Sequence, residues 1–152
     1  MTGPTDQAQA ELLDPSTERG ARAMLSHLVE AGDHTLSALL AADPAPEVLA
    51  RVLSDSSPEF GAARLRAARV DTRASAAYAI RQGISVLMPG DAQWPDGLID
   101  VAEVPVCLWV DGPLDLSRLR RSGVSIVGSR AATAYGRDIA AGLAAGLSER
   151  GY

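Results

Sequence analysis

The residues best suited to chemistry lie in one stretch near the C-terminus, Val124-Ser125-Ile126-Val127-Gly128-Ser129-Arg130-Ala131-Ala132-Thr133-Ala134-Tyr135-Gly136-Arg137. A run dominated by β-branched apolar residues, 124–127, ends at Gly128 and leads through a polar loop. The next segment repeats Ile139, Leu143 and Leu147 at every fourth position. This order predicts a buried strand, a tight turn and an amphipathic helix.

Such a unit is able to bind an anion, and phosphate is the expected guest. The first N–H groups of a helix lack intrahelical partners, and the helix dipole makes that end positive. Gly128 allows close approach or a positive φ, Ser129 and Thr133 supply hydroxyls, and Arg130 offers a planar fork for phosphate oxygens. The alternative interpretation is structural, because strand–glycine–helix junctions are common in α/β domains. Spacing alone leaves both interpretations open.

Other cofactor and catalytic patterns are missing from the sequence. No glycine lies between Gly128 and Gly136, so the dinucleotide fingerprint is disfavoured, and the chain has no lysine for a Walker motif. Two histidines, His27 and His34, and the distant Cys107 cannot build a Cys/His metal site. We expect both histidines at the surface and Cys107 in the core. The sequence predicts no cofactor, no metal and no enzyme activity.

Charge and composition restrict the class of protein. The chain has 152 residues and 47% hydrophobic content, enough for one domain or two small ones. Its net charge of −5 argues against indiscriminate nucleic-acid binding. After Gly112, however, the sequence has six arginines and three acidic residues, so this part has a net charge of +3 and the preceding part a net charge of −8. There is no signal sequence or membrane-length apolar segment, and we expect a cytoplasmic protein.

The N-terminal half has helical spacing. Residues 1–13 are polar or small without a period, and we expect a disordered tail. Asp14-Pro15 reads as a cap followed by a first-turn proline, which predicts a helix over 15–31 that stops at Gly32. Further short apolar repeats continue to residue 82. The segment 14–82 is therefore predicted to be a small all-α bundle.

The period changes at Gly83. Two short apolar runs, 84–88 and 106–110, predict strands, and three leucines within 114–119 predict a brief helix. Trp94 and Trp109 accompany these strands. Each ring either packs onto the core or offers a platform for a nucleobase.

Three ordered blocks in this half resemble the DNA-processing protein A (DprA/Smf) family. They are the strand and P-G-D-x-x-W-P loop within 83–98, the P-x-x-L-W-x-x-G segment at 105–112, and V-x-I-V-G-S-R-x-A-T-x-Y-G at 124–136. The resemblance implies an α/β fold class. A sterile-alpha-motif-like or helix-hairpin-helix-like domain would occupy 14–82, and the beginning of a Rossmann-like parallel-sheet DNA-binding domain would occupy 83–152. We expect that second domain to be incomplete, because strand 124–127 and its helix lack the next parallel strands.

The resemblance also implies a function. It indicates a cytosolic protein that binds single-stranded DNA, helps load the recombinase RecA during natural transformation and forms a homodimer as a full-length protein. The phosphate-contacting or loop-shaping positions that carry over are Gly128, Ser129, Arg130, Thr133, Tyr135 and Gly136. The helical domain departs from a DNA-binding hairpin, because 30–34 contains one glycine and two acids. We expect a packing or protein-interaction role there.

An enzyme remains the alternative. The lysine-decarboxylase-like phosphoribohydrolase fold also opens with a G-S-R-like loop and processes nucleotides. It expects a downstream P-G-G-x-G-T-x-x-E motif whose Glu is the catalytic acid. Against this interpretation stand the P-G-D-x-x-W-P block and the helical N-terminal region, which those enzymes lack.

Overall fold

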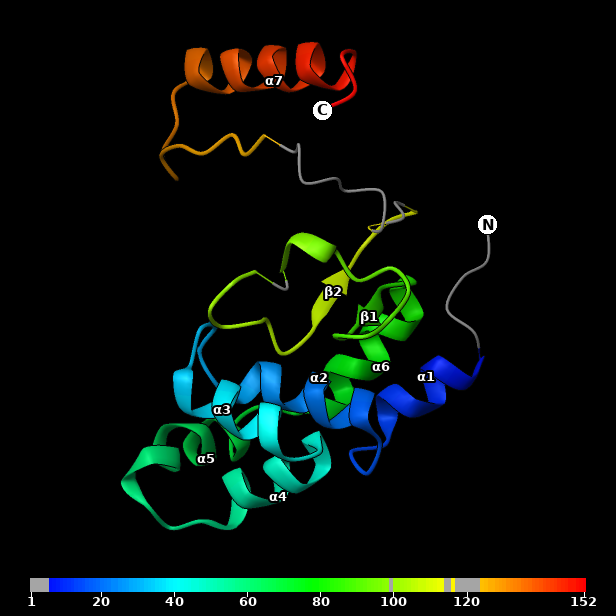
Figure 1. Ribbon diagram of the computed structural model, residues 1–152, viewed down its shortest axis with the longest axis vertical. Helices are drawn as coiled ribbons and strands as arrows, with labels where there is room; N and C mark the ends of the chain where they lie inside the picture. Colours follow the sequence, from blue (N-terminus) through cyan, green and yellow to red (C-terminus); the bar gives the residue numbers. More distant parts are fainter. Residues whose placement is uncertain (1–5, 99, 114–115, 117–123) are drawn as a thin grey trace.

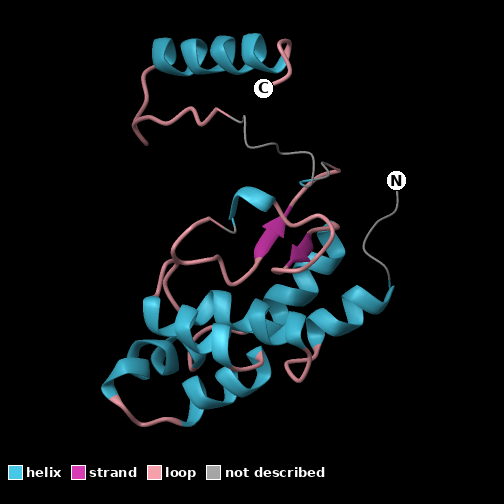
Figure 2. Cartoon of the chain, viewed as in Figure 1, coloured by secondary structure: helices cyan, strands magenta, loops and turns pink. Residues whose placement is uncertain are grey.

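The computed structural model describes residues 6–98, 100–113, 116 and 124–152, and helices dominate it (Figures 1 and 2). The elements are α1 (Asp6–Leu13), α2 (Glu18–Leu28), α3 (His34–Ala42), α4 (Ala45–Ser54), the 3₁₀ turn η1 (Pro58–Phe60), α5 (Gly61–Ala67), α6 (Thr72–Gln82), β1 (Ser85–Leu87), η2 (Asp96–Leu98), β2 (Leu108–Val110) and α7 (Ala134–Ser148).

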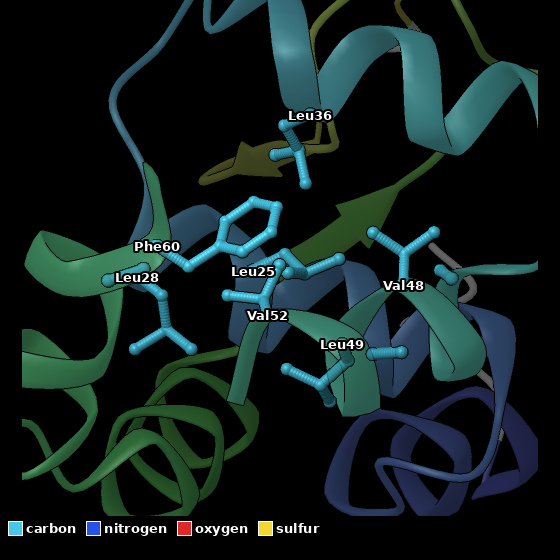
Figure 3. Close-up of a cluster of buried hydrophobic side chains, with 10 residues drawn as sticks. Leu25, Leu28, Leu36, Val48, Leu49, Val52 and Phe60 are labelled. Atoms are coloured by element: carbon cyan, nitrogen blue, oxygen red, sulfur yellow. The ribbon is translucent and has the colours of Figure 1, made fainter. Parts of the chain in front are cut away.

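Helix α2 is the centre of the bundle, and it packs against α1, α4, α5, α6 and β1. Its apolar positions recur at helical spacing, so they form one buried stripe that meets the stripe of α4. Figure 3 shows the resulting core, in which the labelled side chains are Leu25, Leu28, Leu36, Val48, Leu49, Val52 and Phe60. Short polar residues start three helices of the bundle: Thr17, Asp33 and Asp71 accept hydrogen bonds from backbone N–H groups in the first turns of α2, α3 and α6.

The predicted helix over 15–31 is shorter in the structure. Thr17 takes the capping role expected of Asp14, and the helix runs from Glu18 to Leu28. The Asp14 carboxylate instead accepts hydrogen bonds from the backbone N–H and the hydroxyl of Ser16. That local turn competes with helix formation, which is why the chain enters the helix later than the Asp-Pro pair suggests.

The prediction of a disordered tail over 1–13 is wrong for residues 6–13, which form α1. Leu12 is buried in a second core together with Ala23 of α2, Ala76 of α6, Val86 and Cys107. The isolated sequence of α1 has little helical amphipathicity, so packing against α2 and α6 stabilises it. No local pattern in the sequence indicates that α1 packs against these helices.

The sheet in the described residues consists of β1 and β2, which pair antiparallel with Val86 opposite Trp109. Both strands fall within the predicted runs 84–88 and 106–110. The predicted parallel sheet is not formed within the described ranges, so the Rossmann-like domain stays a prediction. The predicted helix over 114–119 lies outside the described residues except for Leu116.

None of the described helices combines the length and the apolar character that crossing a membrane requires.

Gly83 ends α6 in the left-handed conformation, with φ of +72°. Its N–H donates to the Ile80 carbonyl, and the next N–H, of Ile84, reaches back to Ala79. Because a Cβ is strained at this φ, Gly83→Ala should lower the free energy of unfolding by about 1–2 kcal/mol. Urea unfolding followed by circular dichroism measures this cost. Gly97→Ala, at a position without positive φ, should cost less, and an equal cost would contradict the explanation.

Candidate nucleic-acid interface

The predicted phosphate loop leads directly into α7, which confirms the helix predicted after Gly128. Thr133 is the N-cap, and its hydroxyl accepts the Gly136 N–H at 3.1 Å. Earlier in the loop, the Ser129 hydroxyl accepts the Ala131 N–H at 3.1 Å. Each hydroxyl uses a lone pair here and still has a proton to donate. Both side chains are therefore able to donate to a phosphate oxygen without breaking the loop.

The entrance to α7 is electropositive. The first turn of the helix contains no acid. Arg130 is exposed, and no acidic group pairs with it anywhere in the described ranges. Arg137 folds back so that its guanidinium donates to the Ala132 carbonyl at 2.9 Å. Arg137 is not among the predicted site residues, and in the structure it adds positive charge to the first turns of α7.

Three of the predicted positions have no special geometry. Gly128 has no positive φ, so the expected left-handed conformation is not present there. A Cβ at Gly136 would lie 3.5 Å from the Thr133 Oγ1, an ordinary contact. Tyr135 is 75% exposed and does not pack under the helix. Space around Gly128 is open, which leaves close approach of a ligand as a prediction.

The buried strand predicted over 124–127 is wrong for this structure. The segment has no helix or strand, and Val127 is 90% exposed. β-Branched residues form a strand only where a neighbouring strand satisfies their backbone groups and covers their side chains. The described sheet joins β1 to β2 alone. Helix α7 likewise has no buried residue and lies apart from the bundle in Figure 1.

The P-G-D loop after β1 is held by the helical bundle. Arg19 of α2 makes a two-pronged contact with the Asp91 carboxylate, at 2.8 and 3.0 Å, and also donates to the Val86 carbonyl at 2.6 Å. The Met88 N–H donates to the same carboxylate at 2.9 Å. Burial alone raises the pKa of Asp91, but the hydrogen bonds from Arg19 and Met88 and the charge of Arg19 outweigh it and lower the pKa.

Both tryptophans make packing contacts, but only Trp94 is fully buried. Trp94 is 5% exposed, which confirms the packing interpretation for that ring. Trp109 is partly buried, its Nε1 donates to the Ser26 hydroxyl at 3.1 Å, and its ring centroid lies 5.3 Å from that of His27. His27 is therefore partly buried and not fully at the surface as predicted, and burial lowers its pKa. His34, 85% exposed in its side chain, confirms the surface prediction; its Nδ1 lies 2.7 Å from Glu103.

Cys107 is a core thiol, as predicted. It lies in the second core, and burial raises the pKa of its thiol, which suppresses the reactive thiolate. Within the described residues, no three side chains of the His, Cys, Asp and Glu types come together in a way that could hold a metal ion.

A comparison with known families matches the C-terminal part of the chain. Residues 85–152 match the family described as DNA recombination-mediator protein A. This part of the chain is similar to that family. The match confirms the resemblance found in the three sequence blocks, and it includes β1, the P-G-D loop, β2 and α7.

Two curated relatives agree with the DNA recombination-mediator protein A match. Both are provisionally named DNA processing protein DprA, and they come from Mycobacterium tuberculosis strains CDC 1551 / Oshkosh and ATCC 25618 / H37Rv. Each is 37% identical over 82 residues, which covers 47% of this chain and 21% of the relative. The aligned part is thus about a fifth of the length of these relatives. No solved structure matches the chain significantly.

The boundary of the DNA recombination-mediator protein A match separates the two partners of one ion pair. Asp91 lies inside the matched region, whereas Arg19 lies in α2, outside it. The helical bundle therefore positions a loop of the family region through a specific bidentate contact, in addition to the apolar contacts of the second core.

Proposed function

We propose that this chain binds single-stranded DNA without catalysing a reaction, as part of DNA processing in recombination or natural transformation. Support comes from the family match over 85–152 and from the names of the mycobacterial relatives. The observation that carries the proposal is the start of α7, where Arg130 is exposed, makes no ion pair among the described residues and precedes the capped, positive end of the helix.

The mechanism is recognition of the DNA backbone. Arg130 would contact a phosphate through its guanidinium, and the hydroxyls of Ser129 and Thr133 would donate to the same or the next phosphate. The exposed ring of Tyr135 would stack on a base, a contact that tolerates any sequence. Gly128 and Gly136 would keep the loop open for the strand.

Further parts of the proposal follow from the family. The run 124–127 would pair as a parallel strand in a Rossmann-like sheet, which would cover the apolar side chains that are exposed here. The full-length protein would form a homodimer, act in the cytoplasm and assist loading of RecA.

A salt titration tests the phosphate site. Fluorescence anisotropy with a labelled single strand of roughly 20 nucleotides should show binding that weakens as salt rises. Arg130→Ala should weaken binding about ten-fold and make the log–log salt slope shallower by about 0.7, the share of one phosphate contact. Arg150→Ala is the matched control, because it removes the same charge just beyond the other end of α7 and should change binding little.

Three results would overturn the proposal. The first is an absence of single-strand binding. The second is an equal loss for Arg130→Ala and Arg150→Ala, which would reduce the effect to net charge. The third is release of a base from a nucleoside monophosphate by the chain, which would place it with the phosphoribohydrolase enzymes instead.

A further inference from the structure

A depression beside α6 combines aromatic side chains with positive charge. One hollow, of about 500 Å³, is lined by His27, Tyr78 and Trp109. A second, of about 190 Å³, is lined by His27, Trp109 and Arg73. The two hollows share His27 and Trp109, and together they make up the surface beside α6. Helix α6 packs against α1 and α2 (Figure 1). We call this surface the α6 groove, defined by His27, Arg73, Ser75, Tyr78, Ile84 and Trp109.

Charge in and around the α6 groove favours an anion. No acidic side chain lines either hollow, although the chain has 19 acids and 14 arginines. Arg73 lines the smaller hollow, whereas Arg81 lies further along α6 and lines neither. Both are exposed, and within the described part of the chain neither makes an ion pair. The nearest acid in sequence, Asp71, caps α6 by accepting the Ala74 N–H at 2.8 Å. Eight positions separate the two arginines, about 12 Å along the helix axis, so they would contact different phosphates.

The aromatic rings offer surfaces for flat ligands. Tyr78 is 55% exposed, so its ring is open to stacking. Trp109 is held by its contacts with Ser26 and His27, which fix the orientation of the indole. Burial lowers the pKa of His27, which disfavours a positive charge on this ring at the floor of the groove. Aromatic platforms flanked by arginines are the arrangement with which proteins bind single strands irrespective of sequence.

We propose that the α6 groove is a second contact surface for single-stranded nucleic acid. Bases stack on Tyr78 and Trp109, and Arg73 and Arg81 hold the phosphates on either side. An apolar peptide would use the rings but would leave the two arginines without partners, so the charge favours a polyanion. The inference rests on the proposed DNA-binding function and extends it from the family region to a helix outside the match.

Two probes separate base stacking from charge. An oligothymidylate of about 20 nucleotides is compared with an abasic strand of equal length, which carries the same phosphates and no bases. Tyr78→Ala should weaken oligothymidylate binding about ten-fold and leave the abasic strand unaffected. Arg73→Ala/Arg81→Ala should weaken both and make the salt slope shallower by about 1.4, the share of two phosphates. Arg51→Ala/Arg150→Ala removes the same two charges elsewhere and should change the slope less.

The outcomes distinguish this inference from the phosphate site at α7. If Arg130→Ala weakens binding while the α6 variants behave like the Arg51→Ala/Arg150→Ala control, the α6 groove is not a DNA contact and the proposed function stands. If the α6 variants weaken binding while Arg130→Ala does not, the second surface stands and the α7 site is wrong. Equal effects of Tyr78→Ala on both probes, or no single-strand binding by the folded chain, would overturn the inference.

Discussion

Replacement of Gly20 by alanine should unfold α1 from the bundle and destabilise the whole domain. Gly20 lies in α2 where the chain between α1 and α2 crosses it. A Cβ built on this glycine would lie 2.0 Å from the Asp14 carbonyl oxygen and 2.7 Å from that of Glu11. All the near atoms belong to the backbone, so no side-chain rotation relieves the clash. We expect Gly20→Ala to lower the free energy of unfolding by about 3–5 kcal/mol.

The measurement is urea unfolding followed by tryptophan fluorescence, since Trp94 and Trp109 are both at least partly buried in the folded chain. Hydrogen exchange over residues 6–13 shows whether α1 also detaches locally. Gly61→Ala is the matched control, because that glycine has helical dihedral angles and no atom within 4 Å of a built Cβ. It should be neutral or stabilise by up to about 1 kcal/mol. Similar losses for the two variants would show that the clash is relieved by relaxation.

The crossing of the chain at Gly20 also explains why α1 was not predicted from the sequence, whereas later helices were. Val48, Leu49 and Val52 repeat at helical spacing, and this repeat alone predicts α4. Helix α1 depends on one buried leucine, Leu12, and on a glycine that lets two backbones meet. Neither feature has a periodic signature, because both are contacts between segments.

In the candidate site, too, local features were predicted from the sequence and contacts between distant segments were not. The helix after the loop is a local feature, so the sequence predicted it, whereas the capping role of Thr133 was not predicted. The environment of 124–127 depends on a partner strand, and an apolar run carries no information about whether that partner is in place. Likewise, the P-G-D motif predicted a turn, but its bidentate contact with Arg19, 72 positions earlier in the chain, was beyond pattern reading.

The contact between Arg19 and Asp91 should contribute strongly to the free energy of unfolding. The side chains of Arg19 and Asp91 are 14% and 19% exposed, so removing one partner leaves the other poorly solvated. Asp91→Asn keeps the shape of the side chain but replaces one accepting oxygen by an amide and removes the charge. It should lower the free energy of unfolding by about 2–3 kcal/mol at pH 7. Asp96→Asn, an exposed acid nearby in the chain, should change it by less than about 0.5 kcal/mol.

The pH dependence follows from the lowered pKa of Asp91. A carboxyl whose pKa is lower in the folded state contributes stability that is fully present above its unfolded pKa, about 3.9. This contribution is lost as pH falls below that value and through the folded pKa. The stability difference between the natural chain and Asp91→Asn should therefore be constant from pH 7 to about pH 5 and shrink by pH 3. Urea unfolding of both proteins at these pH values measures it. A difference that is unchanged at pH 3 would mean that packing of the loop, not the ion pair, holds it to the bundle.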